Sequence, residues 1–168
     1  MNKLLISLSL ILVLAPFATS HGGDMPDHWW EECHANQMYT WSDLSDKLQH
    51  EWKNKYVFVD FFMQRCYWCW KALPDFNQFV DNMREEYGED QVEFIKVDAK
   101  SGRDIISKYG VQSYPTFMVI HPNSNGKIID FFEEERRTFR YFKKWATSIM
   151  KNVEPLNTYA TLAPKDTP

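Results

Sequence analysis

The sequence predicts an α/β fold in which a central mixed β-sheet is flanked by helices. Three observations indicate this class. Two apolar, β-branched runs alternate with helical patterns, which is typical of strands joined by helical crossovers. Two later runs are separated by a short turn containing Asn-Gly, which is typical of an antiparallel hairpin. An amphipathic helix follows the hairpin, so we expect an α/β sandwich with crossovers first and a hairpin last.

The first helix is expected to begin near Ser42, which can cap it. Its buried face has apolar residues at helical spacing, namely Leu44, Leu48 and Trp52. Residues 56–62 follow and are almost continuously apolar or β-branched. Such a run is typical of a central strand that is buried on both faces.

A second helical pattern runs from Trp70 to about Tyr87 and contains Pro74, which should kink it. Its core face consists of Phe76, Phe79, Val80 and Met83. Residues 92–97 then predict a second strand, which ends at Asp98.

The remaining elements are a short helix, a hairpin and a last helix. The short helix is expected over residues 105–109, because Gly110 can close it. Residues 116–120 and 127–132 are the two strands of the hairpin. The last helix has an apolar face made of Phe139, Phe142, Trp145, Ala146 and Ile149.

Two cysteines, Cys66 and Cys69, lie between the first strand and the second helix. A thiol at a helix N-terminus lies at the positive end of the helix dipole, which favours the thiolate over the thiol. We therefore predict that Cys66 is the nucleophile. Cys69 lies about one turn further along, where it can attack a mixed disulfide and release the product. A simple structural cross-link is the alternative.

Five further features are spaced in a regular way around these cysteines. Asp60 lies six residues before Cys66, and Pro74 lies five residues after Cys69. The other three are Lys96 in a Lys-Val-Asp-Ala motif, the tripeptide Tyr114-Pro115-Thr116, and Arg137 eight residues before Trp145.

Together with the element order, these features resemble the thioredoxin-like fold over roughly residues 41–151, and in particular the catalytic domain of protein disulfide isomerases. The resemblance implies that Lys96 is the partner of a buried carboxylate at Asp60. It also implies a cis peptide bond at Pro115, which exposes the backbone of Tyr114 to an extended substrate chain.

The same resemblance implies that Arg137 can swing toward the active site, although a run of charges at a helix start is usually only solvated. The chain departs from the family next to the cysteines. Arg65 replaces the usual tryptophan, and the two intervening residues are the bulky aromatics Tyr67 and Trp68, which we expect to bind substrate.

Asp60 lies inside an apolar strand, where a carboxylate costs several kcal/mol unless it is paired or protonated. We expect it to act as a general base with a raised pKa that takes the proton from Cys69, often through water. A structural aspartate neutralised by Lys96 is the alternative, and the two roles are compatible.

Cys33 is left over from a total of three cysteines. We expect it to be free, or to form an intermolecular or glutathione disulfide. A zinc site that combines Cys33 and His34 with Cys66 and Cys69 is a further alternative. Adjacent residues rarely converge on one tetrahedral ion, so this pair is a poor ligand set. We therefore expect no metal and no other cofactor.

The first twenty residues are expected to be a signal peptide, because Lys3 precedes a short apolar stretch and small residues precede His21. That stretch falls short of the ~20 apolar residues that span a bilayer, which disfavours the rival membrane anchor. We expect a loosely ordered lead-in at 21–40, a thioredoxin-like domain at 41–152 and a disordered tail at 153–168. The last four residues are not an ER-retrieval signal of the Lys-Asp-Glu-Leu kind.

The sequence thus predicts a monomeric thiol–disulfide oxidoreductase of the endoplasmic reticulum lumen or the secreted fraction. Its substrates would be cysteine-containing polypeptides, and a redox partner that the sequence does not identify would recycle the dithiol. A net charge of −4 without a basic cluster gives no reason to expect nucleic acid as a partner. A thioredoxin-like reductase and a non-catalytic polypeptide-binding module remain as alternatives.

Overall fold

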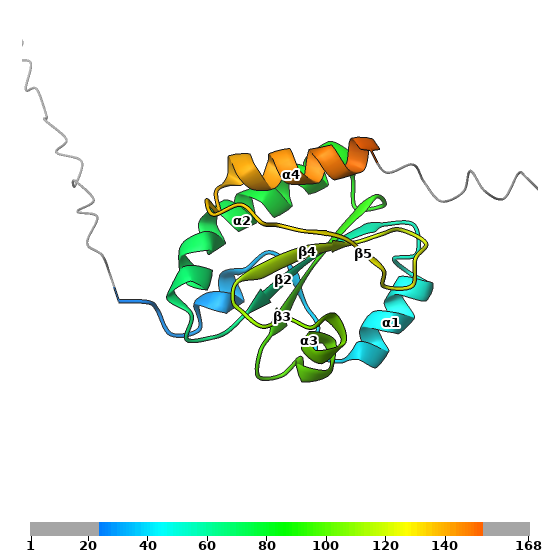
Figure 1. Cartoon of the computed structure of the whole chain (residues 1–168). Helices are drawn as coiled ribbons and strands as arrows, with labels where there is room; N and C mark the ends of the chain where they lie inside the picture. The colour runs from blue at the N-terminus through cyan, green and yellow to red at the C-terminus, as the bar shows by residue number, and fades with distance from the viewer. Residues whose placement is uncertain (1–23, 153–168) are drawn as a thin grey trace, which may run out of the picture.

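A five-stranded sheet in the order β1-β3-β2-β4-β5 lies between two layers of helices in the computed structural model, which describes residues 24–152 (Figure 1). The expected signal peptide and tail lie outside the described residues. The elements are η1 (Trp29–Glu32), β1 (Asn36–Gln37), α1 (Trp41–Gln49), β2 (Tyr56–Phe62), α2 (Tyr67–Tyr87), β3 (Val92–Asp98), α3 (Arg103–Tyr109), β4 (Thr116–Ile120), β5 (Ile128–Phe131) and α4 (Phe139–Asn152).

The sheet is mixed, as the sequence predicts. Strand β3 pairs in parallel with β1 and β2, whereas β4 pairs antiparallel with both β2 and β5. The turn between β4 and β5 has positive φ at Asn125 (52°) and Gly126 (94°), a conformation that favours these two residue types. The predicted hairpin is therefore confirmed.

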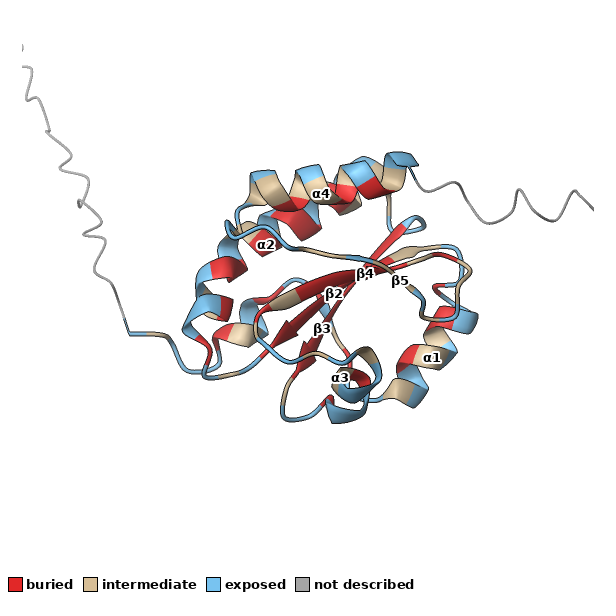
Figure 2. Cartoon of the chain, in the orientation of Figure 1, coloured by how far each residue is buried: buried red, intermediate tan, exposed pale blue. Residues whose placement is uncertain are grey.

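Strand β2 contributes to two separate cores, because successive side chains of a strand point to opposite faces of the sheet. Phe58 and Phe62 pack in the core under α2 and α4, whereas Val57 and Val59 pack in the core on the side of α1 and α3. Figure 2 shows that the central strands are buried along most of their length. The expectation of a strand covered on both faces is confirmed.

Three helix starts differ from the sequence prediction, the smallest case being α3, which begins at Arg103 and not at residue 105. Helix α1 begins at Trp41 and is capped by Thr40, whose hydroxyl oxygen accepts a hydrogen bond from the Asp43 amide at 3.1 Å. Ser42 lies inside the first turn and is not the cap, because it is Thr40 that has the extended backbone a cap requires. Helix α2 begins at Tyr67, three residues before Trp70. Cys66 is therefore its N-cap residue, and Cys69 lies in its first turn.

The lead-in that we expected to be loosely ordered is ordered in its described part, residues 24–40. It contains η1 and β1, and Trp29 is buried against the ring of Phe62. Strand β1 forms one edge of the sheet beside β3. The sequence pattern missed these elements because they are too short to show a period.

Among the described residues, no helix is long and apolar enough to cross a membrane.

The core under α2 and α4 is dominated by aromatic rings. Phe79 is fully buried and contacts the rings of Phe58, Phe76, Phe94 and Phe142. We predict that Phe79→Ala lowers the free energy of unfolding by about 3–5 kcal/mol, since the cavity cannot close around rigid rings. Urea unfolding measures this change.

The matched control is Tyr39→Ala, because Tyr39 is 56% exposed. It should change the free energy of unfolding by about 0.5 kcal/mol or less. Equal effects of the two substitutions would contradict this description of the core.

Candidate active site

Cys66 and Cys69 form a disulfide at the start of α2. Cys66 is the N-cap residue, and its Sγ accepts a hydrogen bond from the Cys69 amide at 3.1 Å. Both cysteines are largely buried, at 7% and 4% exposure, with Cys66 the more accessible. The amide and the helix dipole both stabilise negative charge on Cys66 when the bond is open, which supports the prediction that Cys66 is the attacking thiolate.

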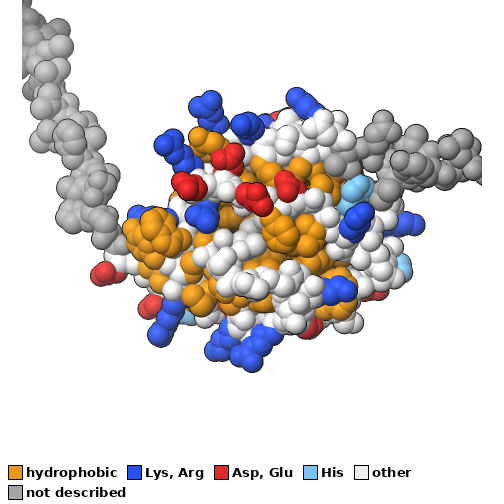
Figure 3. All heavy atoms as spheres, in the orientation of Figure 1, with side chains coloured by type: hydrophobic (Ala, Val, Ile, Leu, Met, Phe, Trp, Pro, Cys, Tyr) orange, Lys and Arg blue, Asp and Glu red, His pale blue; other side chains and the backbone are white. Residues whose placement is uncertain are grey.

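An apolar, largely aromatic surface surrounds this disulfide. Met63, Tyr67 and Trp68 are three of the four large hydrophobic residues that are exposed in the described chain, at 43%, 51% and 65%. We call these three residues the aromatic rim. Figure 3 shows hydrophobic side chains gathered at the end of the molecule where α2 begins. The Lys71 ammonium lies over the Tyr67 ring at 5.5 Å, which holds one side of the rim in place.

The peptide bond between Tyr114 and Pro115 is cis, as the resemblance implies. Thr116, the next residue, pairs with Phe61 near the end of β2 that leads to the cysteines. The Tyr114-Pro115 loop and the disulfide therefore lie at the same end of the sheet. This places the Tyr114 backbone where a substrate chain at the disulfide could pair with it.

Asp60 is buried in β2 with 7% exposure, and its Oδ1 has no hydrogen-bond partner within the described chain. Burial raises the pKa of this carboxyl to about 7, against the opposing effect of the Lys96 charge. The carboxyl therefore changes its protonation near neutral pH, which is the property required of a general base.

Lys96 lies beside Asp60 in the register of β2 and β3. Its ammonium does not form the direct ion pair that we expected. It donates instead to the Trp30 carbonyl at 2.8 Å and the Cys33 carbonyl at 3.2 Å, and no carboxylate of residues 24–152 lies within ion-pair distance of it. Lys96 thus acts on Asp60 only through its charge at longer range.

Arg137 lies in the segment before α4 and is partly buried. It makes no hydrogen bond or ion pair with any described residue, so the structure does not join it to the disulfide. The Asp75 carboxylate, just after Pro74 in α2, accepts a hydrogen bond from the Phe139 amide at 2.7 Å. That bond keeps the start of α4 beside α2. A role for Arg137 stays a prediction.

Cys33 is a free thiol with 8% exposure. Burial, together with the nearby charge of Asp60, raises the pKa of this thiol to about 12. A buried, protonated thiol is a poor nucleophile, which argues against the intermolecular or glutathione disulfide that we expected in the folded protein. Within residues 24–152, no three His, Cys, Asp or Glu side chains gather at a possible metal site.

The geometry agrees with what is found in known proteins. A family model described as thioredoxin matches residues 37–146. The chain belongs to the thioredoxin family.

Relatives in this family include protein disulfide isomerases. Protein disulfide-isomerase A5 of Mus musculus is 27% identical over 114 residues, covering 66% of this chain and 20% of that protein. Probable protein disulfide-isomerase A4 of Caenorhabditis elegans is 32% identical over 78 residues, covering 46% of this chain and 12% of that protein. The chain thus spans a fifth or less of these relatives.

A solved thioredoxin from Fasciola hepatica has the same fold, with a TM-score of 0.54 and 28% identity over 70% of this chain and 99% of that one. The predicted thioredoxin-like fold is therefore confirmed. Family and relatives together support a thiol–disulfide oxidoreductase in general terms.

This member of the thioredoxin family also has site residues that the sequence analysis missed. A cavity of about 360 Å³ lies beside Cys66 and is lined by Met63, Gln64, Arg65, Asp98 and Lys100. Asp98 is 5% exposed, and its Oδ1 has no partner in the described chain. The sequence could have indicated Asp98, because it ends a predicted strand next to the strand that leads to the dithiol. A carboxylate buried at such a place is often functional.

We predict that Asp60 makes stability depend on pH. In the unfolded chain its carboxyl loses a proton near pH 4, whereas in the fold it keeps the proton until about pH 7. The unfolded state therefore binds fewer protons in this window, so the free energy of unfolding decreases as the pH rises. The decrease is about 4 kcal/mol at most, since each pH unit corresponds to about 1.4 kcal/mol.

Urea unfolding of the oxidised protein at several pH values between 4 and 8 measures this slope. Asp60→Asn should remove the contribution, because an amide does not titrate. The exposed control Asp90→Asn should keep it. A slope that is the same in all three proteins would contradict the raised pKa of Asp60.

Proposed function

We propose that the protein exchanges disulfides with cysteine-containing polypeptides in the manner of a protein disulfide isomerase. The observation that carries the proposal is the Cys66–Cys69 disulfide at the N-terminus of α2, beside an exposed aromatic rim. The protein disulfide isomerases among its relatives support the same reading.

In the oxidising direction, a substrate thiolate attacks Sγ of Cys66. The bond between Cys66 and Cys69 breaks, and the electron pair leaves with the Cys69 sulfur, which takes up a proton. A second substrate thiolate then attacks the substrate sulfur of the mixed disulfide. The substrate leaves as a disulfide, and the enzyme is left with two reduced cysteines.

In the reverse direction, the Cys66 thiolate attacks a substrate disulfide, and Cys69 resolves the mixed disulfide. Cys69 must lose its proton to attack, and Asp60 is the base that accepts it, with water as the carrier. With a pKa of about 7, Asp60 can accept a proton in one direction and return it in the other. The proposed base therefore suits an exchange that runs both ways.

The substrate is an extended polypeptide segment around a cysteine. Its backbone pairs with Tyr114 in the cis-proline loop, and its apolar side chains contact the aromatic rim. Tyr and Trp provide large contact areas at low entropic cost and tolerate many partners. Such a surface suits unfolded chains with no common sequence.

We place this activity in the secretory pathway, either in the endoplasmic reticulum lumen or outside the cell. The signal peptide expected at residues 1–20 supports this compartment, as do the disulfide isomerases among the relatives.

The reduction potential of the Cys66–Cys69 pair tests this proposal. The mature protein is equilibrated with glutathione buffers, and its free thiols are trapped and counted. A value near −180 mV supports a disulfide isomerase, whereas a value near −270 mV favours a reductase, the reading supported by the similarity to Fasciola hepatica thioredoxin. A pair that does not titrate reversibly would exclude both and leave a polypeptide-binding module.

We predict that Cys69→Ser traps substrate on Cys66, since the mixed disulfide can form but cannot be resolved. Cys66→Ser should instead reduce exchange to the uncatalysed rate and trap nothing. Non-reducing electrophoresis with an unfolded test protein that contains disulfides shows the trapped species, because the Cys66 thiolate attacks a substrate disulfide and the second substrate sulfur leaves as a thiol. Dithiothreitol should release the trapped substrate. Trapping by Cys66→Ser in place of Cys69→Ser would reverse the assigned roles.

We also predict that replacing both Tyr67 and Trp68 with Ser raises KM for an unfolded polypeptide about tenfold, the effect expected of losing two contact residues. The rate constant with oxidised glutathione, which is too small to cover the rim, serves as the reference. The control is Tyr39→Ser, an exposed aromatic outside the rim. If the double variant lowered kcat/KM for the polypeptide and the rate constant for glutathione equally, the prediction would be wrong, and the rim would act on the dithiol itself.

A further inference from the structure

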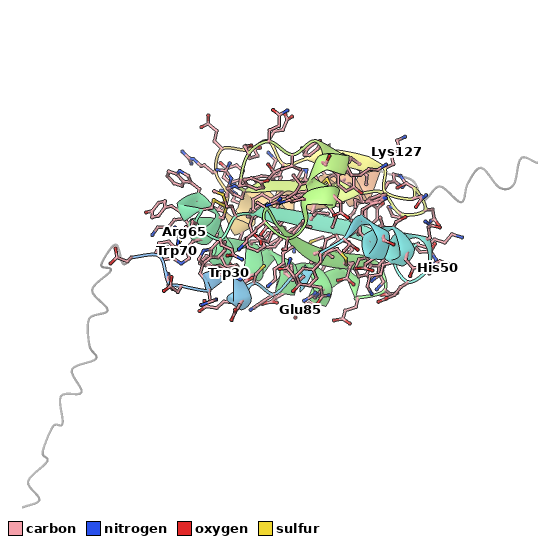
Figure 4. The ribbon with its side chains drawn as sticks, turned by 90° about the horizontal axis from the view of Figure 1, so that it is seen from below. Trp30, His50, Arg65, Trp70, Glu85 and Lys127 are labelled. Atoms are coloured by element: carbon pink, nitrogen blue, oxygen red, sulfur yellow. A yellow bond between two sulfur atoms is a disulfide. The ribbon has the colours of Figure 1, made fainter. Side chains whose placement is uncertain are left out.

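Residues 29–38 include both carbonyls to which the Lys96 ammonium donates, and we call this segment the N-terminal brace. Its first residue, Trp29, is 2% exposed and donates its indole N–H to the Gln64 carbonyl at 2.8 Å, two residues before Cys66. In Figure 4, Trp30 lies at the same end of the molecule as Arg65 and Trp70, far from His50 at the other end. The brace therefore lies at the dithiol.

Four contacts fix the brace to α2, one of which is the hydrogen bond that the Arg84 guanidinium donates to the His34 carbonyl at 3.1 Å. The Asn77 side chain accepts a hydrogen bond from the His34 amide at 2.9 Å and donates one to the Glu32 carbonyl at 2.8 Å. The His34 ring contacts the Asp81 carboxylate at 2.8 Å. The C-terminal part of the brace is fixed to the sheet, since the short strand β1 pairs with β3. The brace is thus a well-defined part of the fold.

The brace supplies both hydrogen-bond acceptors of the buried Lys96 ammonium, the carbonyl oxygens of Trp30 and Cys33. Without them, the ammonium would be buried without partners, which is costly. The unpartnered Oδ1 of Asp60 is an acceptor on the neighbouring strand. Lys96 would then pair with Asp60 directly and stabilise its charged form.

Few other groups can influence Asp60. The ionisable groups that act on it are Lys96 from β3 and the thiol of Cys33 from the brace. Strand β4 places the apolar Phe117 beside it. The buried residues of α2, which covers this face, are Cys69, Ala72, Leu73, Phe76, Phe79, Val80 and Met83. Of these, only the Cys69 thiol can ionise, and it does so once the disulfide is open. The position of Lys96 is therefore the main variable.

We propose that the N-terminal brace is a positioning element that keeps Lys96 off Asp60 and so leaves Asp60 free to exchange a proton during resolution. This inference rests on the proposed function and deepens it. It assigns a role to a segment outside the β-α-β core that carries the cysteines. Trp29, Asn77 and Asp81 are its positioning residues, and they act through the placement of Lys96.

The test releases the brace through the double variant Asn77→Ala, Asp81→Ala, which removes three of its four contacts with α2 and leaves the buried core intact. The matched control is Gln78→Ala, Glu85→Ala, on exposed positions of the same helix. Trp29→Ala is the second releasing variant, because it removes the buried anchor. The oxidised protein has one free thiol, Cys33, so its alkylation rate by iodoacetamide reports release of the brace.

The readout is the pH dependence of resolution, measured by rapid mixing as the rate at which Cys69 releases glutathione from Cys66. In the wild type the rate should rise with a midpoint near the pKa of Asp60, about 7, and Asp60→Asn should lose this rise. In both releasing variants the midpoint should move down by about one pH unit or more, toward that of a paired carboxyl. Cys33 should react about tenfold faster, as for a locally opened segment.

An unmoved midpoint in both variants overturns the inference, whether or not Cys33 becomes reactive. A midpoint that moves equally in the control also overturns it. If the wild type releases no glutathione at any pH, the proposed function fails. The inference is then decided by infrared spectroscopy of the carbonyl band of protonated Asp60. The band is assigned by its absence in Asp60→Asn. Its pH midpoint is measured in the wild type and in the releasing variants, where it should be lower.

Discussion

The burial of β2 on both faces is the constraint on which the rest of the molecule depends. Its pairing with β3 and β4 places it in the middle of the sheet, so its side chains supply both cores. The chain leaves this strand at a fixed place and in a fixed direction, and the first turn of α2 follows within a few residues. The disulfide therefore lies just beyond the end of a strand that is buried on both faces.

The same constraint explains why the protonation of Asp60 is sensitive to its surroundings. A charge in the middle of β2 is largely shielded from bulk solvent, and Asp60 is left with an oxygen that has no partner in the described chain. Small changes in its surroundings then decide whether it holds a proton. The fold tolerates this destabilising group because strands on both sides and two helical layers hold the remainder of β2 in place.

The sequence was sufficient for the parts of the molecule that follow a period or a local motif. Strand β2, the hairpin and the position of Cys66 at a helix start could all be predicted, because each depends on neighbouring residues. The direction of the Lys96 ammonium could not, since its acceptors are 66 and 63 residues away in the chain. The burial of Cys33 was missed for the same reason, as a short irregular segment has no pattern that reveals its contacts.

Both edges of the sheet are short, with two residues in β1 and four in β5. A short edge offers few free N–H and C=O groups, so it is a poor template for another strand. This limits edge-to-edge association between copies of the protein, even at the high concentrations of a crowded compartment. Under the proposed function, the loop before β4, next to the sulfur atoms, is then the main place where the backbone of an unfolded client would find hydrogen-bond partners.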